Sequence, residues 1–374
     1  MKKIVVVLPN LVGGGAERLA IYLAHDWLER GFSVEFILME SKGDLLTLLD
    51  ERVSLVDLKS KKIRKALFPL AKALRKSNPD VIWSGLWPLT SVSILSWIFA
   101  GKKGRLFTID HNYLSISTIK QLNVPSILLK FVMRLTYPFA TGVMTVSHGA
   151  RLDLENLGSF EKGRVKVIYN PAATGKTALY NVSSDESINL WGRTVKYKVI
   201  TAGALSDQKN HKLLIRSFSK ISQIREAKLI ILGEGELRSE LEDLIKSLNL
   251  EDKVKLLGFV KEPYPWFLSA DLFVLSSDWE GLPTVLVESL ECGLPIVSID
   301  CPSGPYEILE KGKYGKLVPL YDELALTKAI EESLTQDHNL ESLRIRAKDF
   351  SLDKISSEYL EYFGLLNARS KKNL

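Results

Sequence analysis

Two glutamates, Glu280 and Glu288, stand eight positions apart in WEGLPTVLVESLECGLP (279–295). Paired carboxylates can act as acid and base on one glycosidic bond when they lie roughly 5–9.5 Å apart. Here Pro283 suits the first turn of a helix that ends at Gly293. At ~1.5 Å per residue, the eight-residue spacing separates the glutamates by up to about 12 Å along the helix axis. This separation disfavours a mechanism in which both glutamates act on one glycosidic bond.

Two ends of one longer ligand fit the spacing better. The N–H groups of Thr284, Val285 and Leu286 would be free at the start of the predicted helix, and a helix amino end favours a phosphate. Glu280 would receive hydroxyls on one side of the phosphate and Glu288 hydroxyls on the other. A hexose, a diphosphate and a ribose have this order, so we predict a nucleotide-sugar site. The alternative is two unrelated acids, one near a helix start and one on its surface.

Further candidates follow two predicted strands. In TIDHN (108–112), Asp110 and His111 come at the end of one strand and just after it. In ALSDQKNHKLL (204–214), Lys209 lies where a loop leads into a helix. An isolated histidine is often structural, and most lysines are solvated. The carboxyl ends of parallel strands, however, are where such folds bind ligands, and a lysine there can reach a diphosphate.

Two glycine-containing segments invite a phosphate-binding interpretation. LVGGGAER (11–18) follows a predicted strand and opens a helix, which suits a structural turn as well as a loop that approaches a phosphate. It is not a complete G-x-G-x-x-G motif, because position 18 is arginine. ATGKT (173–177) lacks the first glycine of a P-loop, because position 170 is asparagine, so we reject it.

We expect neither a metal ion nor a cofactor. The sequence has no D-x-D triplet, although DWE (278–280) is near one, so cationic side chains and helix dipoles must neutralise a departing diphosphate. The two cysteines, Cys292 and Cys301, make neither a metal cluster nor a disulfide framework, which fits a reducing cytoplasm. The five apolar residues after the first three are too few for the core of a signal peptide.

Short β-branched runs alternate with helical patterns along the chain, which predicts a doubly wound α/β architecture. Several runs are almost continuously apolar, as parallel strands buried on both faces are. The predicted strands are residues 3–9, 33–39, 53–58, 81–86, 105–110, 142–147, 165–170, 197–203, 228–233, 254–260, 272–277, 295–300 and 316–319.

The length of 374 residues exceeds what one hydrophobic core usually supports, so we expect two domains. The alternation of elements is interrupted between Pro171 and Lys196. We therefore place domains at 1–175 and 190–350, with a helical tail at 351–374 that can return to the first domain. Two such domains leave a cleft between the carboxyl ends of their strands.

The net charge of +6 is unevenly distributed. Residues 1–180 hold 25 Lys and Arg against 14 Asp and Glu, a net +11, which leaves −5 for the rest. KSKKIRKALFPLAKALRKS (59–77) has eight basic residues and no acid, with apolar residues at helical spacing. It suits an anionic membrane surface and equally a solvated helix over the sheet, and SILLKFVMRLTYPFA (126–140) would add apolar anchoring. No nucleic-acid-binding motif is present, so we do not expect nucleic acid as a partner.

The segment EGLPTVLVE resembles the E-x7-E element of retaining, GT-B-fold glycosyltransferases of family four. Other segments with this resemblance are GGGAER, VSHGARLDLENLG, VIYNP, ALSDQKN, ILGEGELRSELE and YGKLVP. The long run from LLGFVKEPYPW to CPSGPYEIL is similar to bacterial enzymes that extend undecaprenyl-diphosphate-linked oligosaccharides.

The resemblance implies a GT-B fold, in which two Rossmann-like, doubly wound parallel-sheet domains face each other across a cleft. The first domain would be on the acceptor side and the second would bind the nucleotide sugar. The enzyme would move a hexose from a nucleotide diphosphate sugar, UDP rather than GDP, to a hydroxyl of a lipid-linked saccharide, retaining the anomeric configuration. It would be cytoplasmic and peripheral on the inner face of the plasma membrane. A nucleotide-sugar 2-epimerase of the same fold and a non-catalytic sugar-binding protein are the alternatives.

The resemblance also implies roles for single residues. Glu280 would contact the donor sugar, His111 would lie near its hexose, and Lys209 would neutralise the diphosphate. Glu288 would bind the ribose. The remaining donor-binding residues would be Gly14, Gly15 and Gly203 near the diphosphate, Gly281, Leu282, Pro283, Thr284 and Val285 at the sugar and diphosphate, and Phe259 and Val260 beside the base.

The chain departs from the family pattern at two positions. Ala204 stands in a Gly203-Ala204-Leu205 turn where the family commonly has arginine, which removes one cation from the expected diphosphate site. Either Lys209 carries more of the charge or Arg18 helps. Tyr306 follows CPSGP where related sequences often have arginine, which leaves the role of that loop open.

Overall fold

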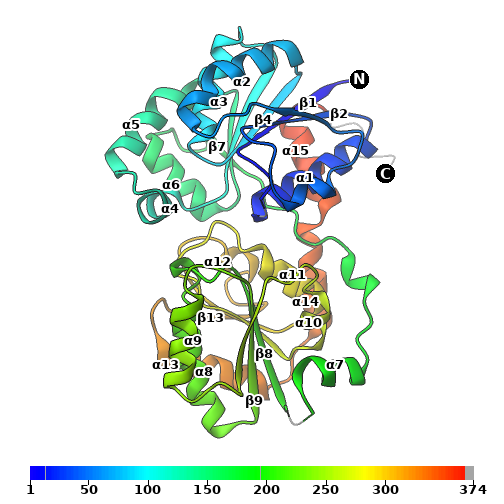
Figure 1. Cartoon of the computed structure of the whole chain (residues 1–374), viewed down its shortest axis with the longest axis vertical. Helices are drawn as coiled ribbons and strands as arrows, with labels where there is room; N and C mark the ends of the chain where they lie inside the picture. Colours follow the sequence, from blue (N-terminus) through cyan, green and yellow to red (C-terminus); the bar gives the residue numbers. More distant parts are fainter. Residues whose placement is uncertain (13, 194, 367–374) are drawn as a thin grey trace. The chain divides into compact units, whose positions relative to one another are not determined.

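The computed structural model describes residues 1–12, 14–193 and 195–366. The chain divides into two units: Met1–Pro171 together with the chain from Leu352 on, and Ala172–Ser351 (Figure 1). The segment between the two expected domains therefore belongs to the second unit. Gly13 of the glycine-rich segment and residues 367–374 of the expected tail lie outside the described residues.

The first unit is built on a seven-stranded parallel sheet in the order β3-β2-β1-β4-β5-β6-β7. Its strands are β1 (Lys3–Leu8), β2 (Ser33–Leu38), β3 (Ser54–Asp57), β4 (Val81–Gly85), β5 (Arg105–Asp110), β6 (Gly142–Thr145) and β7 (Val165–Val167). The run Ile4–Leu8 is fully buried, because helices cover both faces of a parallel sheet. The order reverses between β1 and β4, whose carboxyl ends lie side by side.

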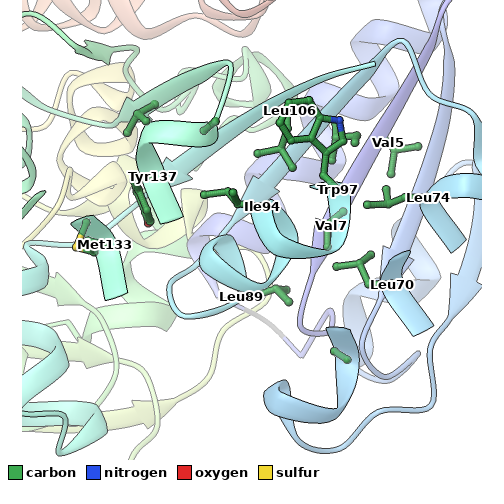
Figure 2. Packing of buried hydrophobic residues seen from close by; sticks show 14 of the residues in the cluster. Val5, Val7, Leu70, Leu74, Leu89, Ile94, Trp97, Leu106, Met133 and Tyr137 are labelled. Atoms are coloured by element: carbon green, nitrogen blue, oxygen red, sulfur yellow. The ribbon is translucent and has the colours of Figure 1, made fainter. Parts of the chain in front are cut away.

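Helices cover both faces of this sheet. They are α1 (Gly15–Glu29), η1 (Asp44–Leu48), α2 (Ile63–Ser77), α3 (Leu89–Phe99), α4 (Leu114–Leu122), α5 (Ser126–Thr136), η2 (Tyr137–Phe139), α6 (His148–Gly158) and α15 (Leu352–Tyr362). Figure 2 shows Leu70 and Leu74 of α2, Ile94 and Trp97 of α3, and Met133 of α5 in one core with the sheet. The burial of each such side chain stabilises the fold by about 1.5–3 kcal/mol.

The opposite face of this sheet is covered by α1 and by α15, which comes from the end of the chain. Trp27 of α1 makes edge contacts with Tyr359 and Phe363, whose ring centroids lie 6.4 and 5.9 Å away. Arg30 of α1 also pairs with Asp353 at 2.6 Å. The described part of the tail therefore packs on the first unit.

The second unit is built on a six-stranded parallel sheet in the order β10-β9-β8-β11-β12-β13. Its strands are β8 (Tyr197–Ala202), β9 (Ala227–Leu232), β10 (Val254–Gly258), β11 (Leu272–Leu275), β12 (Ile296–Ile299) and β13 (Lys316–Val318). Its helices are η3 (Lys176–Leu179), α7 (Ser184–Trp191), η4 (Asp207–Lys209), α8 (His211–Ile224), α9 (Arg238–Ser247), α10 (Tyr264–Ser269), α11 (Thr284–Cys292), α12 (Pro305–Ile308), α13 (Glu323–Thr335), α14 (Leu340–Ala347) and η5 (Lys348–Phe350).

Each unit is thus a doubly wound parallel sheet, as the alternation of patterns predicts, and every one of the thirteen predicted strands is present. In the second sheet the order reverses between β8 and β11, which pair directly. Within the described residues, every helix is too short or too polar to cross a bilayer.

Candidate functional site

The candidate site of the second unit lies where its strand order reverses. β8 ends at Ala202 and the neighbouring β11 ends at Leu275, so the loops that follow, 203–210 and 276–283, leave the same edge of the sheet. Ligands of open parallel sheets bind outside the carboxyl ends of the strands at such a point. Both sequence segments with candidate chemistry, ALSDQKN and SSDWEGLP, occupy these two loops.

Hydrogen bonds join the two loops into one structure. Their partners are the Asp278 N–H with the Gln208 carbonyl (2.8 Å), the Ser276 hydroxyl with the Lys209 carbonyl (2.7 Å), the Asn210 amide with Asp278 Oδ1 (2.8 Å), and the Gln208 amide with the Trp279 carbonyl (3.0 Å). Because each loop satisfies polar groups of the other, neither can move without breaking several bonds. The site is therefore positioned by paired loops.

A buried ion pair stands at the centre of these loops. Lys209 Nζ lies 2.6 Å from Glu280 Oε1, with side-chain exposures of 18% and 7%. The Ser277 hydroxyl donates to the same carboxylate oxygen at 2.6 Å, and the Gln208 amide donates to Oε2 at 3.3 Å. Two charges out of water are costly unless further hydrogen bonds satisfy them, and these two donors satisfy the carboxylate of the pair. The structure thus brings together the two residues singled out from the sequence as sugar-binding acid and diphosphate-binding cation.

Gly203 leaves space for the Lys209 side chain, and the nearby His211 is uncharged at neutral pH. A Cβ at Gly203 would lie 3.0–3.3 Å from three carbons of that side chain, so glycine leaves the space it occupies. His211, at the start of α8, is buried, and burial and the nearby Lys209 charge lower its pKa to about 4. At neutral pH the imidazole is therefore uncharged, and Lys209 is the cation beside Glu280.

The start of α11 differs from the sequence prediction in one respect. Pro283 is the residue before the helix, with φ −71° and ψ 93°, and the Leu286 N–H donates to its carbonyl oxygen at 3.0 Å. The prediction of a free Leu286 N–H was therefore wrong, because a tight first turn takes up that donor. The N–H groups of Thr284 and Val285 precede this bond and point along the amino end of the helix. Gly293 ends the helix in a left-handed conformation, as predicted (φ 72°).

The CPSGP loop (301–305) contacts the backbone of the turn before α11. The Ser303 hydroxyl donates to the Gly281 carbonyl at 2.8 Å. Gly304 has φ 93°, and a Cβ there would lie 2.4 Å from Cδ of Pro283. Only glycine fits this position, so the loop whose role the sequence left open is a backbone support for residues 281–283.

Other predicted donor-binding residues lie in the same unit. Glu288 is on α11, partly buried, in the second helical turn. Phe259 follows β10 and is 68% exposed, which leaves its ring free to meet a flat ligand, while Val260 beside it is partly buried. Hydroxyls and amides that the sequence did not single out, Ser276, Ser277, Gln208, Asn210 and Ser303, complete the site. The signal that could have found them is adjacency in the sequence: Gln208 and Asn210 flank Lys209, Ser276 and Ser277 directly precede DWE, and Ser303 lies inside CPSGP.

Three predicted residues belong to the first unit. Gly14 is the residue before α1 and Gly15 its first residue, both exposed at the carboxyl end of β1. Burial raises the pKa of Glu17 in the first turn of α1 above its ordinary value, although a backbone hydrogen bond opposes the shift. His111 follows β5, and burial lowers its pKa to about 4, opposed by its neighbour Asn170. Its two ring nitrogens are buried, and the Asn170 side chain is near them.

Asp110, one residue before His111, is a structural carboxyl group. It is fully buried and accepts a hydrogen bond from the Tyr137 hydroxyl at 2.7 Å. Burial raises its pKa to about 7, although this hydrogen bond favours the charged form. Among the described residues, no cluster of three or more His, Cys, Asp or Glu side chains could hold a metal ion.

Two family models match the chain. The model described as Glycosyltransferase Family 4 matches residues 13–176, and the model described as Glycosyl transferases group 1 matches residues 187–350. The two matches nearly coincide with the two units of the structure.

Two similar curated proteins come from Campylobacter jejuni. One is named N-acetylgalactosamine-N,N'-diacetylbacillosaminyl-diphospho-undecaprenol 4-alpha-N-acetylgalactosaminyltransferase and is 29% identical over 97% of this chain and 99% of its own length. The other is named GalNAc-alpha-(1->4)-GalNAc-alpha-(1->3)-diNAcBac-PP-undecaprenol alpha-1,4-N-acetyl-D-galactosaminyltransferase. It is 29% identical over 96% of this chain and 98% of its own length.

Solved structures share the fold over the whole chain. HepE from Anabaena, in complex with UDP and glucose, superposes with a TM-score of 0.80 at 21% identity, over 98% of this chain and 100% of its own. A glycosyltransferase from Rickettsia africae superposes with a TM-score of 0.81 at 19% identity, over 100% and 99% of the two chains. At these identities the likeness establishes the fold.

Proposed function

Because this chain belongs to the group 1 and family 4 glycosyltransferases and has their GT-B fold, we propose that it transfers a hexose from a UDP-linked sugar to a lipid-linked saccharide. The acceptor is a hydroxyl of that saccharide, the product is an α-glycoside, and the anomeric configuration is retained. The two Campylobacter relatives, whose names specify undecaprenol-linked acceptors, support the acceptor class. The complex of HepE with UDP and glucose supports UDP as the nucleotide.

The observation that carries the proposal is the buried pair of Lys209 and Glu280 beside the amino end of α11. Each charge of the pair satisfies the other. A diphosphate that arrives at the Thr284 and Val285 N–H groups offers Lys209 a second anion, and the donor sugar offers Glu280 hydroxyl donors. The pair would then divide between the two ends of the donor, with the carboxylate on the sugar and the ammonium on the diphosphate.

In the transfer step, the bond from the anomeric carbon to the diphosphate oxygen breaks and a bond from that carbon to the acceptor oxygen forms. Retention follows when the acceptor attacks on the face from which the diphosphate leaves, and the departing phosphate oxygen takes the acceptor proton. Lys209 and the helix amino end stabilise the growing negative charge on the diphosphate, so no metal ion is required for this role. His111, uncharged at neutral pH, would lie near the donor hexose as a hydrogen-bonding group.

Two substitutions separate the proposed roles. Glu280→Gln should abolish transfer but preserve or strengthen UDP binding, since it removes a negative charge beside the diphosphate site. Lys209→Met should weaken UDP binding at least about tenfold, the loss of one charge-assisted hydrogen bond. Calorimetric titration with UDP measures the binding affinity. Transfer of label from a panel of radiolabelled UDP- and GDP-sugars to extracted lipid-linked acceptors measures turnover. Near-normal turnover of Glu280→Gln would sink the assignment, and epimerisation of a donor supplied without acceptor would favour the 2-epimerase.

We also propose that the protein lies on the inner face of the plasma membrane through the basic segment 59–77. Most of this segment forms α2, whose Ala66, Leu70 and Leu74 are buried against the core. The eight basic side chains of the segment lie outside this buried stripe, which suits a surface of anionic lipids. Replacement of all eight by glutamine should release the protein from anionic vesicles at low salt. Unchanged sedimentation with the vesicles would refute this role.

A further inference from the structure

Helix α5 carries apolar side chains on two opposite faces. On the inner face, Leu129 and Met133 are buried in the core of the first unit, where Figure 2 shows Met133. On the outer face, Ile127, Phe131 and Leu135 are 77%, 61% and 54% exposed. They are four residues apart, about one turn, so they line up along the helix. A helix that is apolar on its solvent side needs an explanation other than the core of its own unit.

The apolar surface continues beyond α5. Phe139 of η2, four residues after Leu135, is 52% exposed, and Lys102 Nζ lies 5.7 Å from the centre of its ring. Phe99, at the end of α3, is 53% exposed and lies beside Phe68 of α2, which is 70% exposed, at 5.8 Å between ring centroids. Because α3 packs on both α2 and α5, these side chains belong to neighbouring helices of one layer. We call the set Ile127, Phe131, Leu135, Phe139, Phe99 and Phe68 the apolar ridge.

The chain around the ridge is almost free of negative charge. Residues 58–152 hold fifteen Lys and Arg against two acids, Asp80 and Asp110, a net +13 in a chain whose total is +6. Asp110 is buried, and Asp80 accepts a hydrogen bond from the Lys3 N–H at 2.7 Å. The next acids along the chain, Asp153 and Glu155, stand on α6, which packs on α5, and both are buried. Lys130 and Arg134 of α5 stand among the exposed apolar side chains. The ridge is therefore an apolar strip within a cationic surface.

This charge selects among possible occupants. A second copy of the chain would bring the same cationic segment against itself, and a neutral apolar partner would leave the cations unmatched. An anionic bilayer matches both properties, since acyl chains receive the apolar side chains and headgroup phosphates receive the lysine and arginine tips. We propose that the apolar ridge inserts into the acyl boundary of an anionic bilayer, with α5 lying in the plane of the interface.

The inference rests on the membrane association proposed above and shares the cations of segment 59–77 with it, but it adds exposed apolar side chains as a separate source of binding. Attraction through the basic segment 59–77 alone would be lost at high salt, because exposed charges more than about 3 Å apart are screened at 1 M. Insertion of the ridge gives binding that persists in salt. The two contributions can therefore fail separately.

The test uses the full chain and vesicles of phosphatidylglycerol and phosphatidylcholine. Phe131→Ser should lower the partition coefficient about tenfold, as expected for withdrawing one aromatic side chain from an apolar environment. A variant with Ile127, Phe131, Leu135 and Phe139 all changed to serine should lose the salt-resistant fraction altogether. The matched control is Leu324→Ser with Ile345→Ser, because these side chains are 71% and 55% exposed on helices of the second unit.

Two readouts make the outcome decisive. A Phe131→Trp variant should be quenched by lipids brominated on the acyl chain, and the four-serine variant should keep wild-type UDP binding and thermal stability. Equal partition of Phe131→Ser and the wild type, or no quenching at position 131, would overturn the inference. The inference would also be overturned if the serine variants bound vesicles as the wild type does but no longer captured an acidic protein. If the wild type inserts but transfers no sugar, the proposed function fails and the ridge does not.

Discussion

The buried pair of Lys209 and Glu280 leads to a quantitative prediction for a double-mutant cycle. Their side chains are 18% and 7% exposed, so removal of one partner leaves the other charge largely out of water. Such losses cost about 3–5 kcal/mol, whereas replacing both charges by groups of similar size is often close to neutral. Glu280→Gln can still accept from the Ser277 hydroxyl, which places it near the lower end, at about 3 kcal/mol.

Lys209→Met leaves the Glu280 carboxylate with the Ser277 and Gln208 donors, so we again expect a loss of about 3 kcal/mol. The double variant should lose less than about 3 kcal/mol rather than the additive sum of about 6, a coupling energy of at least about 3 kcal/mol. Unfolding in urea, followed by hydrogen exchange of the β8 and β11 amides, measures the stability of the second unit by itself. Single variants should remain folded, because a domain has about 5–15 kcal/mol to lose.

The matched control is an ion pair of similar geometry on the surface of the same unit. Lys220 Nζ lies 2.7 Å from Glu323 Oε1, but the two side chains are 42% and 31% exposed. Its cycle should give less than about 1 kcal/mol, because water screens exposed pairs. A coupling energy for Lys209 and Glu280 no larger than this control would refute the reasoning that the site holds a desolvated pair.

Two further predictions concern backbone and protonation. Gly304→Ala should destabilise the second unit by about 2 kcal/mol more than Gly312→Ala. Both glycines have φ 93°, but only a Cβ at Gly304 would lie 2.4 Å from Cδ of Pro283. Equal melting temperatures of the two variants would contradict this prediction. Asp110→Asn should gain stability relative to the wild type as pH rises from 4 to 8. Since the folded pKa of Asp110 is raised from 3.8 to about 7, the folded state holds its proton longer than the unfolded chain, and stability from this group is lost as pH rises through that window. A pH-independent difference between the two urea-denaturation curves would exclude that ionisation.

The fold could be predicted from the sequence because parallel strands are buried on both faces. Runs such as IVVVL are apolar at every position, which a solvated loop or an amphipathic helix is not. The predicted ends were less accurate, and one error is informative. Residues 272–277 were predicted as a strand, whereas β11 ends at Leu275. The two serines that follow leave the sheet and bind Lys209 and Glu280, so the misassigned strand end is part of the site.

The residues of the candidate site were recognisable individually, but their contact was not. Lys209 and Glu280 are 71 residues apart, and no local pattern says that the loops after β8 and β11 exchange hydrogen bonds. The support from Gly304 was equally hidden, because its need for glycine arises from the Pro283 ring on another loop. The free Leu286 N–H was predicted wrongly for a local reason, the tight turn at Pro283.

The apolar ridge also illustrates the difference between pattern and packing. The sequence of α5 is apolar throughout, which is equally consistent with a fully buried helix. Packing decides that one face with Leu129 and Met133 meets the core and the other with Phe131 meets solvent.

By itself, the sequence determined two doubly wound sheets and the polar side chains at their strand ends, because burial of apolar runs and the chemistry of loop residues are local properties. Only the tertiary structure decided that Lys209 and Glu280 neutralise each other. It alone also decided which apolar side chains are left without a core. Both depend on distances between residues far apart in the chain, which are set by strand order and helix packing and have no counterpart in local spacing.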